Sequence, residues 1–249
     1  MAVVLDELMA HAWPPATEQV VGGWRCRWAW GLTRRANFVL TIGAPADLEG
    51  CIGLAEAFYA GRELPVRFQV SSASSPRGLD AALCARGYRE EAPTRMCVAD
   101  AAALAATGER GSWRVEAHAR PSDEWFTVHL DAERRGTPDD TTRRRYLETL
   151  LAPKPRAVFV EASVDGTVAA VGQGVLEAGW LGVQCMATLA AYRRRGGASV
   201  VLRSLAVWAA ERGATGLYLA VAEENAAARR LYAGAGFTSA HGYSYWTLG

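Results

Sequence analysis

The segment YRRRGGASVVLRSL, residues 192–205, places three arginines and two glycines directly before an apolar run. Val201, Leu205 and Trp208 follow a spacing of i, i+4 and i+7, which predicts one buried face of a helix. The first turn of a helix leaves backbone N–H groups without partners, and glycine lets an anion come close to them. The segment therefore predicts a phosphate or pyrophosphate site at a helix N-terminus.

Neither GxxxxGK[ST] nor GxGxxG is present in this segment, so it matches neither of those two nucleotide-binding motifs. Two other interpretations stay open at this point: a solvated arginine cluster before a helix, or contacts to RNA phosphates. The residues of the predicted site are Arg193, Arg194, Arg195, Gly196, Gly197, Ala198 and Ser199.

The composition limits the classes of partner. The chain has 249 residues, half of them apolar, with 27 basic residues against 26 acidic ones. Such a balance argues against a positive charge over the whole protein that would attract nucleic acid or a membrane. Any anion site therefore has to be local. No apolar run reaches the roughly 18 residues that a membrane-spanning helix needs, and the start lacks the features of a signal peptide. We predict a cytoplasmic protein with no nucleic-acid or membrane partner.

The cysteines indicate a reducing compartment and no metal site. They are odd in number and form no CxxC pair, so we expect reduced thiols in the core and neither disulfides nor metal ligands. The five cysteines are Cys26, Cys51, Cys84, Cys97 and Cys185.

Strand and helix patterns alternate through the second half of the chain. Residues 157–188 contain three runs of β-forming residues, and Asp165-Gly166 is a hairpin-turn signal between the first two. The helix of the quoted segment follows, then a strand at 215–224, a short helix and a last strand at 241–249. This order predicts a mixed α/β fold with a central twisted mixed sheet flanked by helices.

The first half repeats this order of elements. Shifting the numbering by 149 residues carries Gly87 onto Gly236, and it carries the strand around Phe68 onto the strand around Leu217. We take residues 99–113 as a connector between two domains, 1–100 and 111–249. The first copy has acids where the second has its glycine pair, so it has lost the anion site.

Asn225 and Tyr232 are seven residues apart, which places them on one side of the short helix. Asparagine is a common N-cap, and a lone tyrosine is commonly a half-buried aromatic side chain. Together with the loop, however, they complete the order strand, RxxGxA, helix, strand, NxxAxxLYxxxGF. This order resembles the GCN5-related N-acetyltransferase (GNAT) family over about residues 180–246. The whole chain resembles a tandem-GNAT arrangement with a degenerate first copy (1–100) and an acetyl-CoA-binding catalytic domain (111–249).

The resemblance implies transfer of an acetyl group from acetyl-CoA to a primary amine. It implies that the amides of residues 194–199 hold the CoA pyrophosphate, with Arg193 beside them and Asn225 near the cofactor. It also implies that the strand around 219–221 turns away from its neighbour and leaves a slot for the thioester. Tyr232 would be the general acid for the departing thiolate, whose ordinary pKa is near 8.5. The residues whose backbone would bind the pantetheine arm are Met186, Ala187 and Thr188.

Two departures from the family pattern concern the chemistry. Many relatives carry a glutamate five residues before the asparagine, where this chain has Ala220. Gly197 stands where relatives commonly have a β-branched residue, which predicts a more flexible loop and weaker cofactor binding. The general base is left open among Glu161, Glu177, Glu223, Glu224, His241 and a water molecule.

We predict an acetyl-CoA-dependent N-acetyltransferase with Tyr232 as its acid. The alternative is a non-catalytic acyl-CoA-binding regulatory module, and an RNA- or ribosome-associated protein is a third hypothesis. The acceptor is a small molecule or a peptide N-terminus, and we expect residues 121–153 to line its site. The chain is a monomer or a homodimer.

Overall fold

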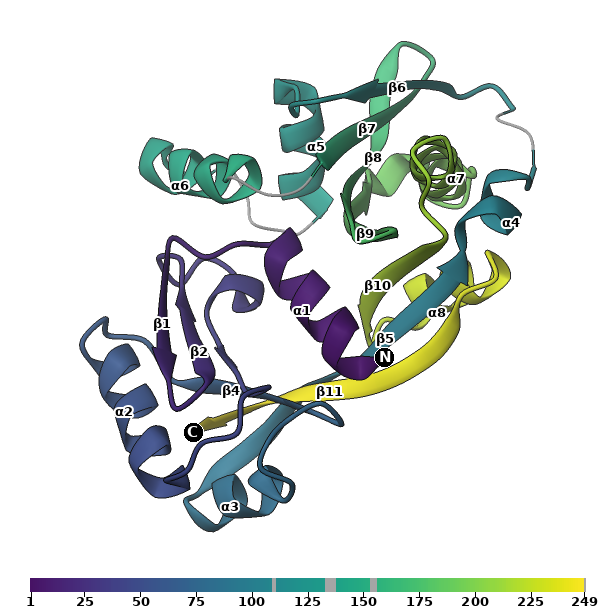
Figure 1. The fold of residues 1–249 in the computed structure, drawn as a ribbon. Helices are drawn as coiled ribbons and strands as arrows, with labels where there is room; N and C mark the ends of the chain where they lie inside the picture. Colours follow the sequence, from purple (N-terminus) through teal and green to yellow (C-terminus); the bar gives the residue numbers. More distant parts are fainter. Residues whose placement is uncertain (109–110, 133–137, 153–155, 249) are drawn as a thin grey trace.

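The computed structural model describes residues 1–108, 111–132, 138–152 and 156–248 (Figure 1). The helices are α1 (Ala2–Ala12), η1 (Arg34–Ala36), α2 (Leu48–Ala60), α3 (Leu79–Ala85), α4 (Ala101–Ala105), α5 (Asp123–Ala132), α6 (Asp140–Leu151), η2 (Ala190–Tyr192), α7 (Gly197–Ala210) and α8 (Ala226–Gly234). The strands are β1 (Thr17–Val21), β2 (Trp24–Trp28), β3 (Val39–Leu40), β4 (Arg67–Ser71), β5 (Tyr88–Asp100), β6 (Arg114–His118), β7 (Arg156–Val164), β8 (Thr167–Glu177), β9 (Trp180–Thr188), β10 (Gly216–Ala222) and β11 (Thr238–Leu248).

The strands of the described residues form one mixed sheet. Their order is β1-β2-β3-β4-β11-β5-β10-β9-β8-β7-β6. The pairs β3–β4 and β9–β10 are parallel, and the other neighbouring strands are antiparallel. Helices lie on both sides of this sheet in Figure 1. The predicted mixed α/β class with a central sheet flanked by helices is confirmed.

The repeat of 149 residues is also confirmed in the element bounds. Shifted by that number, α2, β4, α3 and β5 match α7, β10, α8 and β11 to within two residues at each end. The match holds because both halves follow the same order of helix, strand, helix and strand.

The last strand of each half lies inside the other half's sheet. β11 lies between β4 and β5, and β5 lies between β11 and β10. β5 and β11 are also paired with each other, from Thr238 opposite Val98 to Leu248 opposite Tyr88. Each half therefore completes its sheet with a strand from the other half. The division into domains 1–100 and 111–249 stays a prediction.

The two faces of the sheet carry different helices. Along β10, Leu217 and Leu219 belong to the core cluster of α7, whereas Tyr218 belongs to the cluster that contains Leu5 and Met9 of α1. Because side chains alternate across a strand, α1 and α7 cover opposite faces. Figure 1 shows α1 in front of the middle of the sheet, between the two halves.

None of the five cysteines forms a disulfide with another described residue. Four are buried, as predicted, whereas Cys84 is exposed, so the expectation of a core thiol is wrong for Cys84. Among the described residues, no helix combines the length and the apolar character that a membrane span requires.

Candidate active site

The arginine–glycine loop connects β9 to α7, where the sequence predicts it. Arg194 and Gly196 both have left-handed backbones, with φ of 60° and 88°. Gly196 is the N-cap residue of α7, and no side chain caps the helix there. The N–H groups of the first turn are thus left to a ligand or to solvent, which is the local geometry that binds a phosphate.

The arginines of this loop are exposed. The Arg195 guanidinium lies 3.2 Å from a carboxylate oxygen of Asp165 and stacks over the Tyr192 ring, with 5.2 Å to the ring centroid. The Nε of Arg193 donates to the carbonyl of Thr188 at 3.4 Å. Arg193 and Arg195 therefore both have contacts within the protein, on the loop that precedes α7.

Gly197 is closely packed, which argues against a more flexible loop at this residue; the predicted weaker cofactor binding stays a prediction. A Cβ at this position would lie 2.7 Å from Cη2 of Trp113 and 3.0 Å from Cβ of Ala170. The buried Trp113 indole also donates from Nε1 to the carbonyl of Arg195 at 2.8 Å. Trp113 thus fills the space that a β-branched side chain would occupy and ties the loop to the start of β6.

We therefore expect Gly197→Val to destabilise the protein and to weaken acetyl-CoA binding. Overpacking a filled site costs about 1–3 kcal/mol, and the new side chain would push Trp113 away from Arg195. Thermal denaturation and calorimetric titration with acetyl-CoA measure the two effects. Gly53→Val on α2 is the control, since a Cβ there meets nothing within 4 Å. Equal stability of the two variants would contradict this account of Gly197.

The strands β9 and β10 pair only at their beginnings. Pairing runs from Gly216 opposite Trp180 to Tyr218 opposite Gly182 and then stops. A cavity of about 520 Å³ opens where the strands separate. The predicted separation around residues 219–221 is confirmed, and its use as a slot for the thioester stays a prediction.

A bulge in β9 sets which side chains reach the cavity. Cys185 has a left-handed backbone (φ 52°), and the pairing with β8 changes register next to it. The extra residue turns Met186 toward the α7 face, where a Cβ on Gly172 would lie 2.7 Å from its Sδ. Met186 lines the cavity, whereas Ala187 is buried on the other face and Thr188 is half-buried.

Asn225 and Tyr232 both line the same cavity from α8. Asn225 is the N-cap, and its Oδ1 accepts a hydrogen bond from the backbone N–H of Ala228 at 3.1 Å. Tyr232 is 9% exposed and packs edge-to-face against Phe237. Burial, with a smaller contribution from Cys97, raises the pKa of Tyr232 to about 12. Its phenol therefore keeps its proton at neutral pH.

These features are matched by known proteins. The family described as "Probable histone acetyltransferase Rv0428c C-terminal" matches residues 4–246. The chain belongs to this family of GCN5-related N-acetyltransferases. It is 29% identical over 244 residues to "Uncharacterized N-acetyltransferase YobR" of Bacillus subtilis, a match that covers 97% of this chain and 96% of the relative.

Solved structures agree on the fold. A GCN5-related N-acetyltransferase from Kribbella flavida matches with a TM-score of 0.76 and 15% identity, over 100% of this chain and 95% of that one. The tandem GNAT protein from the clavulanic acid biosynthesis pathway matches with a TM-score of 0.69 and 14% identity, over 98% and 86%. The predicted family and the predicted acetyltransferase class are confirmed.

The candidates for the general base of this acetyltransferase lie outside the cavity. Among the described residues, its lining contains no carboxylate and no imidazole. Glu177 contacts His11 at 3.1 Å, Glu223 pairs with Arg95 at 3.1 Å, and His241 bonds to Asp6 at 2.8 Å. Glu161 is buried in β7, and Glu224 is exposed. Proton transfer from the amine through water stays a prediction.

The N-terminal half of this GNAT protein contributes a wall that the sequence did not reveal. Met9 and Trp13 line the cavity from α1 and its end, and residues 33–35 line it from the η1 region. Within the described part of residues 121–153 no side chain belongs to the lining, and Trp125 and Phe126 are buried in the core. The expectation that this segment forms the acceptor wall is not met there.

A buried arginine on β2 holds this wall. Arg27 is 1% exposed, and its Nη2 donates to the carbonyls of Ala10 and Trp13, both at 2.7 Å. Its Nη1 donates to the carbonyl of Arg35 at 2.9 Å. The last carbonyls of a helix lack partners within the helix, so a cation stabilises the end of α1 here. Arg27 therefore connects the end of α1 to η1.

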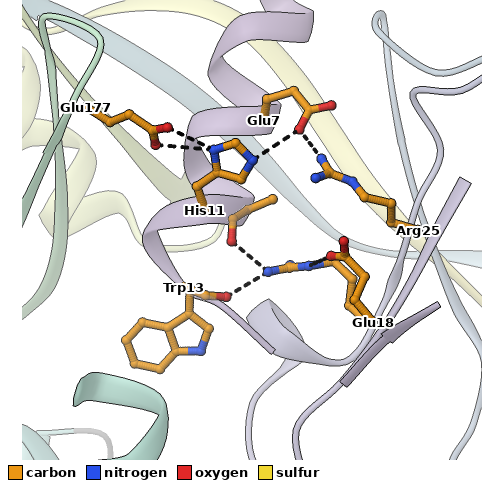
Figure 2. Close-up of polar contacts among 8 residues, drawn as sticks. Glu7, His11, Trp13, Glu18, Arg25 and Glu177 are labelled. Carbon is orange, nitrogen blue, oxygen red and sulfur yellow. Dashed lines mark hydrogen bonds and ion pairs between the residues drawn. The ribbon is translucent and has the colours of Figure 1, made fainter. Parts of the chain in front are cut away.

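The same helix is also tied to the other half of the acetyltransferase. Figure 2 shows His11 between Glu7, on its own helix, and Glu177, with Arg25 reaching Glu7 from the other side. Glu177 is the last residue of β8. Contacts on both sides of α1 thus fix its place across the sheet.

Proposed function

We propose that this acetyltransferase moves the acetyl group of acetyl-CoA directly to a primary amine, with Tyr232 as the general acid. The observation that carries the proposal is the cavity at the separation of β9 and β10, which has Tyr232 and Asn225 in its lining. The proposed binding of the acetyl-CoA pyrophosphate is supported by the first turn of α7, which no side chain caps, and by the exposed arginines of the loop before it.

Each group of the chain has a defined task in this proposal. The first-turn N–H groups and Arg193, Arg194 and Arg195 bind the pyrophosphate, while the β9 backbone at 186–188 binds the pantetheine arm. When bound, acetyl-CoA supplies an activated thioester, so the protein mainly has to orient the amine. Tyr232 holds a proton at its phenol oxygen and donates it to the departing sulfur. The amine gives up its proton through water.

A non-catalytic acyl-CoA-binding module is the second candidate, and one observation favours it. The cavity lining holds neither carboxylate nor imidazole within the described residues, so no side chain there accepts the proton of an ammonium group. The retained Tyr232 favours catalysis, because cofactor binding alone does not require a proton donor at the sulfur.

Calorimetry and a CoA-release assay together test the proposal. We expect acetyl-CoA to bind and, at about 100 times its Kd, to stabilise the fold by about 2.7 kcal/mol. We also expect CoA release that depends on an added amine. Tight binding without transfer to any amine would favour the non-catalytic module, and RNA binding with no effect of acetyl-CoA on thermal stability would contradict both.

A further inference from the structure

A second cavity, the α8 cavity, lies between α8 and the sheet and has a volume of about 410 Å³. Cys97, Val221 and Ser239 line it from β5, β10 and β11. Cys97 and Val221 belong to the core cluster of α7, so the α8 cavity is on the face of the sheet opposite to α1. Tyr232 and Val221 also line the active-site cavity, where β9 and β10 separate. A ligand in the α8 cavity would therefore contact the proposed general acid.

Different sides of α8 line the two cavities. Asn225 and Ala228 line the active-site cavity, whereas Arg229, Arg230 and Ala233 line the α8 cavity. Residues three or four apart share a side of a helix, as Asn225 and Ala228 do, and Arg230 and Ala233 share another side. The α8 cavity is therefore separate from the site that we propose for the cofactor.

Two arginines of the α8 cavity are placed around the same residues. Nε of Arg95 lies 3.1 Å from a carboxylate oxygen of Glu223, and Nη1 of Arg229 donates to the backbone carbonyl of Glu223 at 3.2 Å. Burial raises the pKa of the Cys97 thiol, and the charges of Arg95 and Arg229 partly oppose this rise. Both guanidinium groups therefore lie near Cys97, at one part of the cavity.

The positive charge of this cavity is only partly balanced. Arg230 is exposed and also belongs to the lining. Within the described part of the chain, Glu223 is the one acid that pairs with these three arginines, and the exposed Glu224 lies outside the lining. α8 and β11 contain no acid, and the acids of β5 also lie outside the lining: Glu90, Glu91 and Asp100. The three guanidinium groups therefore keep a net positive charge beside the cavity.

Buried apolar side chains complete the lining of the α8 cavity. Phe237 is 5% exposed, and its ring packs edge-to-face against Tyr232. Val221 is buried as well. A mainly apolar cavity of about 410 Å³ with a few charged groups is typical of a site for a small molecule. An inorganic ion would leave the apolar part unused, so a ligand with an apolar part and an acidic part fits better.

We propose that the α8 cavity binds a small organic acid, distinct from acetyl-CoA. Its apolar body packs on Phe237 and Val221, and its acidic group contacts Arg95 and Arg229. Guanidinium groups are suited to this task, because they bind a carboxylate through charge-assisted hydrogen bonds. Binding at this site requires no acetyl transfer, so it is independent of the proposed function.

Calorimetric titration of the full-length protein with 4-phenylbutanoate, and separately with its carboxamide, tests this site. We expect the acid to bind about tenfold to a hundredfold more tightly than the amide, the range of a charged hydrogen bond. Arg229→Gln should reduce the affinity for the acid toward that for the amide. Ala233→Trp should prevent the binding of both, because the larger side chain fills the cavity. Saturating acetyl-CoA should not displace the acid, because the two ligands occupy separate cavities.

Arg89→Gln is the matched control, because Arg89 is on the same strand as Arg95 but is exposed and outside the lining. It removes the same charge and should keep the preference for the acid. Thermal denaturation verifies that each variant folds, which the exposure of Arg229 and Ala233 favours.

Four results would overturn the proposed site. They are no binding of 4-phenylbutanoate, equal Kd values for the acid and its amide, displacement of the acid by acetyl-CoA, and equally tight binding of inorganic phosphate. If acetyl-CoA neither binds nor acetylates any amine, the proposed function fails, whereas the site for an organic acid stands on its own titration.

Discussion

Tyr232→Phe is expected to lower kcat by at least about a hundredfold while leaving acetyl-CoA binding within about threefold of the unmodified protein. General acid catalysis contributes about 10²–10⁴-fold, and the substitution removes only the proton donor. The ring and its edge-to-face contact with Phe237 remain, so the fold is kept. Steady-state kinetics with an excess of amine give kcat, and calorimetry gives the Kd of acetyl-CoA.

Tyr218→Phe is the matched control, because Tyr218 is also a buried tyrosine that lines the cavity. It lies on the α1 face of β10, in a different core cluster from Tyr232. We expect less than about a threefold change in kcat. If the Tyr218 variant loses most of its activity and the Tyr232 variant keeps full activity, our proposal has assigned the general acid to the wrong tyrosine.

The raised pKa of Tyr232 has a consequence for the pH profile. Burial holds this pKa at about 12, so the phenol carries its proton, and can donate it, throughout the range below that value. Tyr232 should therefore cause no fall in kcat between about pH 6 and pH 9. A decrease with an apparent pKa near 8.5, the ordinary value of a thiol, that Tyr232→Phe abolishes would contradict this assignment.

The sequence predicted the parts of the site that depend on local pattern. The glycine-rich start of α7 and the N-cap Asn225 follow from signals within a few residues of each other. The separation of β10 from β9 was implied only by the family resemblance. The repeat can also be found in the sequence, because elements of nearly equal length keep a constant shift between the two halves. Family resemblance then linked these parts to acetyl-CoA.

The wall from the N-terminal half depends on contacts between distant residues, which no local pattern contains. No local pattern in residues 2–12 shows that they form α1 and bring Met9 to the cavity. The packing of Trp113 on Gly197 joins residues more than 80 positions apart. The exchange of β5 and β11 between halves likewise follows from tertiary pairing and not from strand propensity.

Arg27→Met is expected to lower the free energy of unfolding by about 3–5 kcal/mol, the usual effect of breaking a buried charged network. Three backbone carbonyls, at residues 10, 13 and 35, would lose their donor inside the protein. Burial lowers the pKa of Arg27 to about 10, so the guanidinium that is removed is charged at neutral pH. For a chain of this size, each kcal/mol lowers Tm by about 2–4 °C, so calorimetry should record a decrease of about 6–20 °C.

Arg25→Met supplies a matched comparison, because both arginines are on β2 and both reach α1. Arg25 pairs with Glu7, and both side chains are partly exposed (20% and 33%). Partly exposed ion pairs contribute about 0–1 kcal/mol, so this variant should lose at most about 4 °C in Tm although it removes the same charge. A similar decrease in both variants would mean that net charge, and not the three buried carbonyl contacts, stabilises the end of α1. The contrast between the variants therefore isolates the contacts by which Arg27 holds the cavity wall.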